Sequence, residues 1–344
     1  KLSSFGVNCQ LALLITFVMT YQLSTCRQLF NCQFSNMSRY ICFILLLGSI
    51  SVRAQKTDLR LQKQIQQLLA SFNGRVGVYV HDLKKNRIVA VNADTLFPTA
   101  SVIKIPILIG IMDRIRQKEL DYHQDMVYKD TLNYDPGEDV LASFKPDEKI
   151  QLSKLMLLSI TLSDNTASLM LQGIVGGTRI NELMDSLGLR YTRVNSRTPG
   201  REPNREEYGW GQTTPREIAS LMERIAFGKI FSPRLSERML RILGRQYWDE
   251  NALSQIPPDI FVASKSGAVD ESRNEVLYVN GPHPYIFSIF TKNNKDQSWD
   301  YNNEAAVLTR KLSALLWKYF NPKSDWTGVP VIKNSGIYPN PGFE

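Results

Sequence analysis

Cysteine is missing from most of this 344-residue chain, because none of its four cysteines follows residue 42. The four are Cys9, Cys26, Cys32 and Cys42. The remaining body therefore has no disulfide framework, no thiolate metal site and no thiol nucleophile. A body of this length can bury a large enough core to fold without disulfides.

Histidine is also scarce, and the spacing of the three histidines, His81, His123 and His283, fits no metal-binding motif. We therefore expect neither a zinc site nor a Ser-His-Asp triad. A glycine-rich phosphate loop followed by a helix is absent as well, which argues against the common nucleotide-binding motifs. The sequence thus predicts no metal and no cofactor.

Charge of one sign is not concentrated in the body of the chain. The charged residues up to position 55 are four cations, Lys1, Arg27, Arg39 and Arg53. Without them the net charge falls from +8 to +4, and no block of lysine and arginine remains. This mild balance does not indicate nucleic-acid binding.

The amino-terminal region contains two apolar runs, and the second has the organisation of an export signal. Leu11–Met19 is shorter than the about 20 residues that span a bilayer. After Met37, a short basic segment precedes an apolar run over 40–52 and a small residue near 54. We predict a signal peptide over 37–55, with 1–36 not part of the natural protein. The mature chain would then be periplasmic or secreted and would meet a membrane only through this segment; the alternative is an uncleaved anchor.

Hydrophobic periodicity predicts strands near both ends of the body and helices between them. The expected helices are 58–72, 152–160, 166–172, 180–187, 215–227 and 304–320, and the expected strands are 75–83, 88–92, 261–265, 275–280 and 286–291. We therefore expect an α/β (α+β) fold in 56–320: an antiparallel sheet built from both chain ends and flanked by terminal helices. An all-helical lobe over about 105–250 would be inserted. Residues 321–344 read as an extended tail, and we expect a monomer.

Ser101 and Lys104 begin an otherwise apolar segment and are three residues apart. On a helix these two side chains share a face. A lysine among apolar residues is desolvated, which favours its neutral, basic form, and such a base can activate a serine. One Ser-x-x-Lys is expected by chance in about this length of chain.

Two further polar clusters follow predicted elements. Ser163-Asp164-Asn165 comes after an apolar helix, where it could equally be an ordinary helix cap. Lys265-Ser266-Gly267 closes a predicted strand, where it could equally be a turn, and its glycine permits close approach of a ligand. Neither cluster is specific alone.

Together the three motifs occur once each, in the order found in class A β-lactamases and penicillin-binding proteins, with serine replacing threonine in the last one. The stretches 74–80, 97–101, 164–167 and 213–215 also resemble class A sequence. The resemblance covers about residues 62–320 and implies a β-lactamase/transpeptidase-like fold and a serine hydrolase.

The resemblance also implies roles for individual residues. Ser101 would be the acylated nucleophile and Lys104 its base, and Ser163 would relay a proton to the leaving nitrogen. The other implied contacts are Asn165 to the substrate amide, Lys265 and Ser266 to its carboxylate, Gly267 beside the ligand, and the N–H groups of Ser101 and Ala268 as the oxyanion hole. Arg273 would be a second carboxylate-binding group or, equally, a solvated arginine at a strand edge.

The loop that activates water in class A enzymes departs from the family pattern. Glu-x-x-Leu-Asn is absent, and Gln212 replaces the aspartate before Thr-Thr-Pro. Glu202 is the nearest candidate for the deacylating base, with Glu206 and Glu207 behind it. Each of these glutamates could instead be an ordinary solvated loop charge.

The resemblance implies a hydrolase that opens β-lactam rings through a Ser101 acyl-enzyme that water then hydrolyses. One alternative is a peptidoglycan D,D-peptidase or esterase. The other is a penicillin-binding sensor that is acylated without turnover. The expected partner is therefore a small-molecule β-lactam or a peptidoglycan peptide.

Overall fold

The computed structural model describes residues 55–132, 134 and 138–328. The four cysteines, the upstream segment 1–36, nearly all of the predicted signal peptide and the tail beyond 328 lie outside the described residues. The account below therefore concerns the body of the chain.

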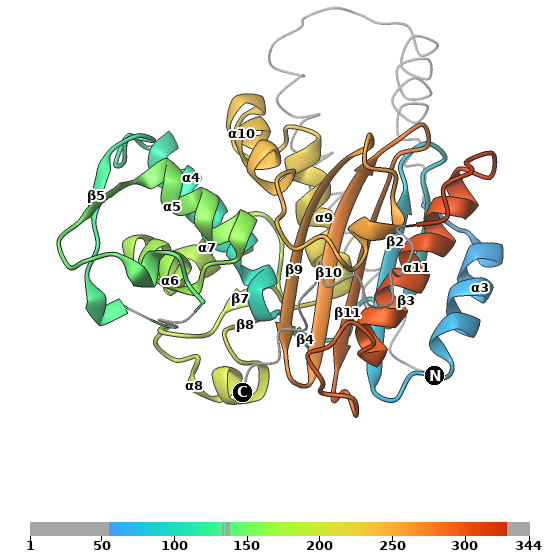
Figure 1. Cartoon of the computed structure of the whole chain (residues 1–344). Helices are drawn as coiled ribbons and strands as arrows, with labels where there is room; N and C mark the ends of the chain where they lie inside the picture. The colour runs from blue at the N-terminus through green and yellow to red at the C-terminus, as the bar shows by residue number, and fades with distance from the viewer. Residues whose placement is uncertain (1–54, 133, 135–137, 329–344) are drawn as a thin grey trace, which may run out of the picture. The chain divides into compact units, whose positions relative to one another are not determined.

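A sheet is built from both ends of the body, as the sequence predicts, but it has six strands rather than five and is not wholly antiparallel (Figure 1). Its order is β1-β3-β2-β11-β10-β9; β1 and β3 are parallel and all other neighbours are antiparallel. The strands are β1 (Lys56–Thr57), β2 (Arg75–Asp82), β3 (Arg87–Val91), β9 (Phe261–Val269), β10 (Ser272–Asn280) and β11 (Tyr285–Lys292).

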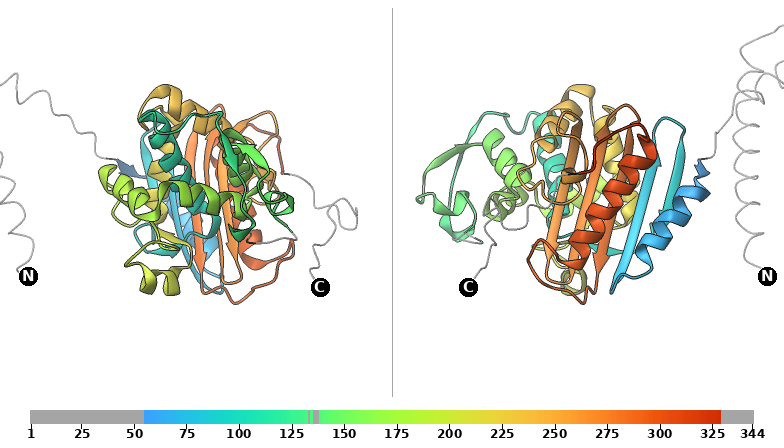
Figure 2. Two further views of the ribbon diagram at one scale, coloured as in Figure 1. Left: turned by 90° about the vertical axis from the view of Figure 1, so that its left-hand side faces the viewer. Right: turned by 45° about the vertical axis from the view of Figure 1, so that its right-hand side comes forward.

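The two terminal helices, α3 (Leu59–Leu69) and α11 (Glu304–Phe320), cover one face of this sheet (Figure 2). Alternate residues of β2, such as Val78, are buried in the cluster that contains Ile65 of α3 and Leu312 of α11. Period-two alternation on the strands and helical periodicity on the helices thus meet in one core. Within the described part of the chain, no helix is both long and apolar enough to cross a membrane.

The opposite face of the sheet packs against α9 (Pro215–Ala226). Tyr79, between the valines of β2, and Phe290 of β11 belong to the second core cluster, together with Ile218 and Met222 of α9. Thr214 caps α9 by accepting the backbone N–H of Glu217 at 3.2 Å, and Pro215 occupies its first turn. This second core extends into the inserted stretch.

The inserted stretch confirms the predicted helices but is not wholly helical. It also forms a three-stranded sheet, β4-β8-β7, and a two-stranded sheet, β5-β6. These strands are two or three residues long, too short for an alternating pattern, and β4 pairs with β8 from far along the chain. The remaining elements are β4 (Phe97–Pro98), η1 (Ala100–Ile103), α4 (Lys104–Arg116), β5 (Asp125–Val127), η2 (Asp130–Leu132), η3 (Leu141–Ser143), β6 (Lys149–Gln151), α5 (Leu152–Leu157), η4 (Leu158–Leu162), α6 (Asn165–Val175), α7 (Gly177–Ser186), β7 (Arg193–Val194), α8 (Glu202–Tyr208), β8 (Gly211–Thr213), α10 (Pro233–Leu243) and η5 (Leu253–Gln255).

Strand β9 is longer than the sequence predicts. Lys265-Ser266-Gly267 does not close it, because pairing with β10 continues through Ala268 to Val269. The sequence predicts the strand only over 261–265, with the motif closing it. Here the ladder carries the strand past the glycine, so the motif lies within a regular strand.

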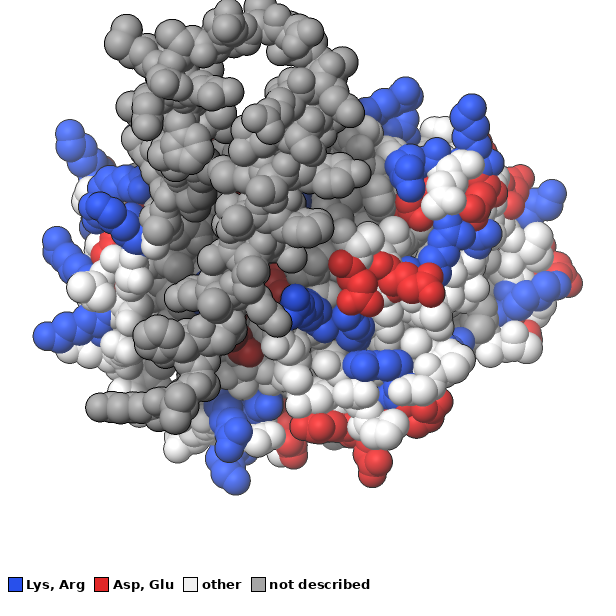
Figure 3. Space-filling model, turned by 180° about the vertical axis from the view of Figure 1, so that it is seen from behind, with Lys and Arg blue, Asp and Glu red and all other residues white. Residues whose placement is uncertain are grey.

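Charges of both signs are spread over the visible described surface on the face opposite to that of Figure 1 (Figure 3). Acidic side chains lie beside basic ones in the centre and along the right of this view. Where described atoms are visible, basic side chains predominate along the left edge, and both signs are mixed in the centre and on the right.

Candidate active site

Ser101 lies in η1, a 3-10 turn that leads directly into α4. The sequence predicts both Ser101 and Lys104 on one helix, whereas only Lys104 belongs to the α-helix. Ala100, just before it, has a left-handed backbone with φ of 43°. The Ser101 side chain is partly exposed, and its hydroxyl makes no hydrogen bond to any described residue. The local geometry thus presents a serine that is not held by other side chains.

Lys104 is the first residue of α4, and its side chain is fully buried. Its Nζ donates to the backbone carbonyl and to the Oγ of Ser163, the latter at 3.0 Å, and to Oδ1 of Asn165 at 2.7 Å. The first and second motifs are therefore in direct contact. A buried amine with three oxygen acceptors is fixed in position relative to the serine one turn before it.

The turn Ser163-Asp164-Asn165 is both a helix cap and part of this cluster. Ser163 follows the π-helical turn η4 and has a left-handed backbone with φ of 60°. Asp164 caps α6, accepting the N–H of Ala167 at 2.7 Å, and also accepts the N–H of Leu141 at 2.9 Å. Asp164 thus acts as the helix cap, while its two neighbours contact Lys104, so the turn takes part in both arrangements.

Asp139 also holds this turn in place, a role that the sequence did not indicate. Its carboxylate accepts the backbone N–H groups of Asn165 at 2.9 Å and Thr166 at 2.8 Å, and the Thr166 hydroxyl at 2.7 Å. These three bonds fix the start of α6 and hence the Asn165 side chain. A single aspartate in a polar loop carries no motif that would have revealed this role.

Lys265 of β9 is fully buried and brings the third motif to the same place. Its Nζ donates to Ser163 Oγ at 3.1 Å and to the backbone carbonyl of Ser266 at 2.8 Å. Ser163 Oγ thus lies between two lysine nitrogens, that of Lys104 and that of Lys265. The predicted motifs, distant in the chain, converge on one hydroxyl.

Burial disfavours the charged form of both lysines. It holds the pKa of Lys104 well below its usual range, helped by the nearby Lys265 and opposed by Asp139 and Asp164. Burial also lowers the pKa of Lys265 to about 7, with Glu275 opposing the shift. Near neutral pH the site can therefore hold a neutral lysine amine, which donates two of the three Lys104 hydrogen bonds and keeps a lone pair, as a base for a serine hydroxyl requires.

Glu275 is a second residue that the sequence did not single out. It lies opposite Ser266 in the β9–β10 ladder and is buried, and Ala252 donates its backbone N–H to it at 3.2 Å. Burial raises its pKa to about 8. Its carboxyl is therefore mostly protonated near neutral pH, and only its ionised form opposes the lowering of the Lys265 pKa.

Gly267 allows β9 to approach the turn that carries Ser101. A Cβ at this position would lie 2.6 Å from the Thr99 carbonyl oxygen and 2.8 Å from the Ser101 nitrogen. Any side chain here would force the strand and η1 apart. The close approach puts the main chain of Ser101 beside the segment that continues to Ala268.

Arg273 is engaged in a different way from either expectation. It is mostly buried, and its guanidinium donates to the carbonyls of Val269 and Ser298, the latter at 3.0 Å. It also lies over the Trp299 ring, with Cζ 4.3 Å from the centroid. Its side-chain hydrogen bonds all go to main-chain carbonyls, so it closes the β9–β10 hairpin and is not a solvated edge residue. Arg273 lies opposite Ala268 in the β9–β10 ladder, but among the described residues its side chain makes no hydrogen bond to Lys104, Ser163 or Lys265.

Glu202 is the first residue of α8 and is exposed. Its Oε1 accepts the backbone N–H of Gly200 at 3.2 Å. Glu206 and Glu207 are exposed as well. Among the described residues, none of these glutamates contacts Lys104 or Ser101, so the structure does not bring the predicted base together with the cluster.

The loop is instead closed by Arg201, whose Nη2 donates to Oε1 of Gln212 and to Oδ1 of Asn195, both at 2.8 Å. The glutamine that departs from the family pattern thus still accepts from an arginine across the loop. Arg201 thus connects the beginning of the altered loop, at Asn195, to its end, at Gln212.

Trp210 is the loop residue that lies against Lys104, with the lysine Nζ 5.4 Å from the ring centroid. Its indole N–H donates to Gln172 at 2.6 Å, and its ring stacks on exposed Tyr134 at 6.3 Å. The sequence did not indicate this residue, because only the carboxylates of the loop fit the role of a general base. A lone aromatic two residues before Gln212 follows no motif that would place it against Lys104.

A partly exposed serine, a buried lysine one turn later and a second buried lysine on the sheet edge define the class of serine hydrolases that use lysine in place of histidine. The chain belongs to the Beta-lactamase2 family, described as a beta-lactamase enzyme family, whose model matches residues 60–320. The predicted recognition and fold are thereby confirmed, and the chain is a serine β-lactamase-like hydrolase.

The chain matches two curated relatives over most of their length. Beta-lactamase SME-1 of Serratia marcescens is 24% identical over 272 residues, 75% of this chain and 89% of that protein. Beta-lactamase BRO-1 of Moraxella catarrhalis is 26% identical over 278 residues, 75% of this chain and 85% of that protein. Among solved structures, a mutant of PBP-A, described as an acyl-enzyme complex with penicillin G, has a TM-score of 0.70 and 27% identity. The match covers 79% of this chain and all of PBP-A.

Proposed function

We propose that this enzyme opens β-lactam rings through a covalent acyl-enzyme on Ser101. The observation that carries the proposal is the contact of two buried lysines with Ser163 Oγ, at 3.0 and 3.1 Å, where one of them, Lys104, lies one turn after a serine whose hydroxyl makes no hydrogen bond within the described residues. The relatives named β-lactamase and the penicillin complex of PBP-A support it.

In the acylation step, neutral Lys104 takes the proton of Ser101 Oγ as this oxygen bonds to the carbonyl carbon of the ring. The C–N bond of the ring breaks, and the nitrogen receives a proton from Ser163. Ser163 recovers its proton from Lys104, to which it is hydrogen-bonded. Lys104 is neutral again at the end of this step, so the protons balance.

Substrate binding uses the groups around this path. Lys265 and Ser266 hold the substrate carboxylate, Asn165 contacts the amide beside the ring, and Gly267 lets η1 approach the strand. The N–H groups of Ser101 and Ala268 stabilise the oxyanion. The close approach at Gly267 supports this pairing, because it brings η1 against β9.

For deacylation we propose that Lys104 also activates the water, since acylation returns it to its neutral form within the site. Glu202 stays a prediction from the sequence for this role. Its exposed carboxylate contacts Gly200, whereas Lys104 lies one turn from the acylated serine. Glu202→Gln separates the two candidates.

The proposal is tested by incubating the protein with a fluorescent penicillin and with a chromogenic cephalosporin. Ser101→Ala should lose both covalent labelling and turnover, because the nucleophile is removed. Ser186→Ala is the matched control, since this serine only donates to the Leu183 carbonyl at the end of α7. Labelling of Ser101→Ala at the parent rate would place the nucleophile elsewhere and refute the proposal.

We also propose that the enzyme acts after export, as a monomer whose catalytic domain is 56–320. The charge-then-apolar pattern after Met37 supports export, and the extent of the family match supports the domain. Mass spectrometry of protein from the cell envelope or medium should find an amino terminus near Lys56. Recovery of a chain that still contains Cys42 would indicate an anchor.

A further inference from the structure

A hollow of about 700 Å³ lies at the end of α4 opposite to Lys104. We call it the α4–α10 hollow, because the end of α4, the following segment up to residue 124 and the start of α10 line it. The lining residues used below are Arg116, Lys118, Tyr122, Arg234, Leu235 and Arg238. None of them belongs to the site described above.

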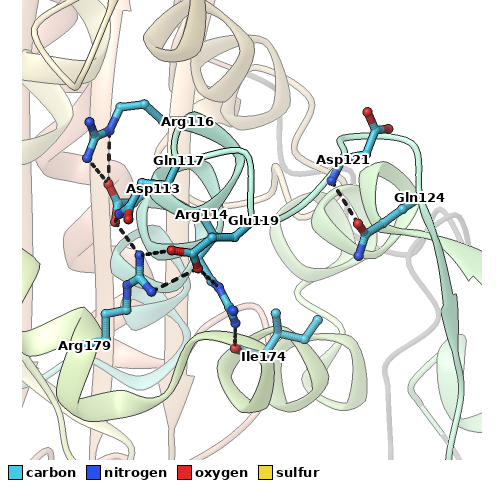
Figure 4. A network of polar contacts seen from close by, with 9 residues as sticks. All are labelled: Asp113, Arg114, Arg116, Gln117, Glu119, Asp121, Gln124, Ile174 and Arg179. Carbon is cyan, nitrogen blue, oxygen red and sulfur yellow. Dashed lines mark hydrogen bonds and ion pairs between the residues drawn. The ribbon is translucent and has the colours of Figure 1, made fainter.

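Next to the hollow, a network of ion pairs links the end of α4 to α7 (Figure 4). Buried Asp113 accepts from Arg116 at 2.7 Å and from Arg179 at 3.3 Å. Glu119 accepts from Arg114 at 2.8 Å and from Arg179 at 3.1 Å. The acidic groups Asp113 and Glu119 are thus already neutralised by other arginines, and Arg116 is committed to Asp113.

Three cationic side chains that line the hollow have no such ion pair within the described residues. The side chains of Lys118, Arg234 and Arg238 form neither an ion pair nor a hydrogen bond with any described residue. The remaining acidic group of the lining is Asp121, which accepts the backbone N–H of His123 at 2.8 Å. The hollow therefore carries about two positive charges that the protein does not balance.

Arg238 is held in place without losing its donors. Its Cζ lies 4.2 Å from the centroid of the Tyr122 ring, which His123 contacts edge-on at 4.9 Å. A guanidinium held by a cation–π contact keeps five N–H donors in a fixed fork. Because the side chain is already ordered, binding an anion costs less entropy than it would for a free surface arginine.

We propose that the α4–α10 hollow binds the phosphate group of a small phosphorylated organic molecule, with Arg238 as the main contact and Lys118 and Arg234 beside it. Two uncompensated positive charges match a phosphate dianion, and an arginine fork fits its oxygens in a bidentate manner. The volume far exceeds that of phosphate alone, and Leu235 and Tyr122 supply apolar surface for an organic body. This inference does not depend on the proposed hydrolysis.

The test measures binding of three probes, glucose 1-phosphate, inorganic phosphate and glucose, by isothermal titration calorimetry. We expect saturable binding of the two phosphates, with glucose 1-phosphate the tighter, and none of glucose. Arg238→Gln should weaken binding at least tenfold. Arg241→Gln, on the same helix and paired with Glu237, should not change it.

Lys118→Gln is a second variant, on another segment, should Arg238→Gln fail to fold. Equal binding by Arg238→Gln and Arg241→Gln, or no saturable binding of either phosphate, would overturn the proposal. Equal affinity for both phosphates would refute the claim that the hollow contacts the organic part of the ligand. Repeating the titration on Ser101→Ala separates this site from the hydrolase: binding should be unchanged there even though labelling by penicillin is lost.

Discussion

At the scale of single residues, the charge of Lys265 is the property of the site most sensitive to pH. Its pKa is lowered to about 7 by burial, so the free enzyme loses this positive charge as the pH rises above 7. The KM for an anionic β-lactam should therefore rise about tenfold between pH 6.5 and pH 8.5, the scale of one charged hydrogen bond.

Lys265→Arg provides the comparison, because arginine keeps its charge across this range. The variant should show a KM that is nearly independent of pH, measured from initial rates at each pH. A parent KM that does not change over this range would show that Lys265 stays charged or does not hold the carboxylate.

Glu202 gives a second test at this scale. Its carboxylate is exposed and contacts Gly200, so Glu202→Gln should slow deacylation by less than about threefold. Loss of a true general base would slow deacylation by a factor of about 10² or more. Single-turnover release of the acyl group, with Glu206→Gln as the control, distinguishes the two values. A fall of about 10² in Glu202→Gln alone would make Glu202 the base.

At the scale of elements, the turn before α6 depends on Asp139. Asp139→Ala removes three acceptor bonds and leaves the N–H groups of Asn165 and Thr166 without their partner. We expect a loss of about 1–3 kcal/mol in unfolding free energy. We also expect a lower acylation rate, because Asn165 and Ser163 are no longer held against Lys104.

Asp94→Ala is the matched control for this prediction, because Asp94 is exposed and pairs with Arg216 on the surface. Chemical denaturation and stopped-flow acylation check the two effects. If acylation by Asp139→Ala matched the control at a temperature where both are folded, the turn would not need this aspartate.

The elements also show how far the sequence could go. Helix α11 begins at Glu304 and ends at Phe320, as its periodicity predicts. The extent of β9 was underestimated, because the continuation beyond Gly267 is set by pairing with β10 and not by a local pattern. Short strands such as β4 could not be predicted, since their partners are remote in the sequence.

The same limit applies to the candidate site. The motifs that meet at Ser163, with Lys104 and Lys265, could be found in the sequence, because the chemistry that the resemblance implies requires particular residue types at fixed spacing. Trp210 could not, because its place against Lys104 depends on how the loop folds between α8 and β8. A motif gives the reacting groups, whereas loop geometry decides which neighbour reaches them.

At the scale of the whole molecule, His81 ties the sheet to α9. Its Nδ1 lies 2.8 Å from Glu223 and its Nε2 lies 3.0 Å from Asn86. Burial lowers the pKa of His81, but the bonds to Glu223 and Asn86 outweigh it, so the pKa is raised above 6.5. A raised pKa in the folded state stabilises the protein fully below about pH 6.5, and this contribution is lost as the pH rises through the folded value.

We therefore expect His81→Gln to be destabilised relative to the parent at pH 5.5–6, by on the order of 1 kcal/mol, and this difference to shrink toward pH 8.5. Urea denaturation at the two pH values measures it. His123→Gln, at an exposed histidine, is the control. A difference that grows with pH would contradict the assigned direction.

The central claim concerns the covalent chemistry of Ser101, and intact-mass spectrometry during penicillin turnover tests it most directly. After rapid quenching, the parent should gain the mass of one intact penicillin, located by peptide mapping on Ser101, and this adduct should disappear as the substrate is consumed. Ser101→Ala should show no adduct. Turnover without any adduct on the parent, or an adduct on another residue, would contradict the account, and an adduct on Ser101 that never decays would identify a penicillin-binding protein without hydrolysis.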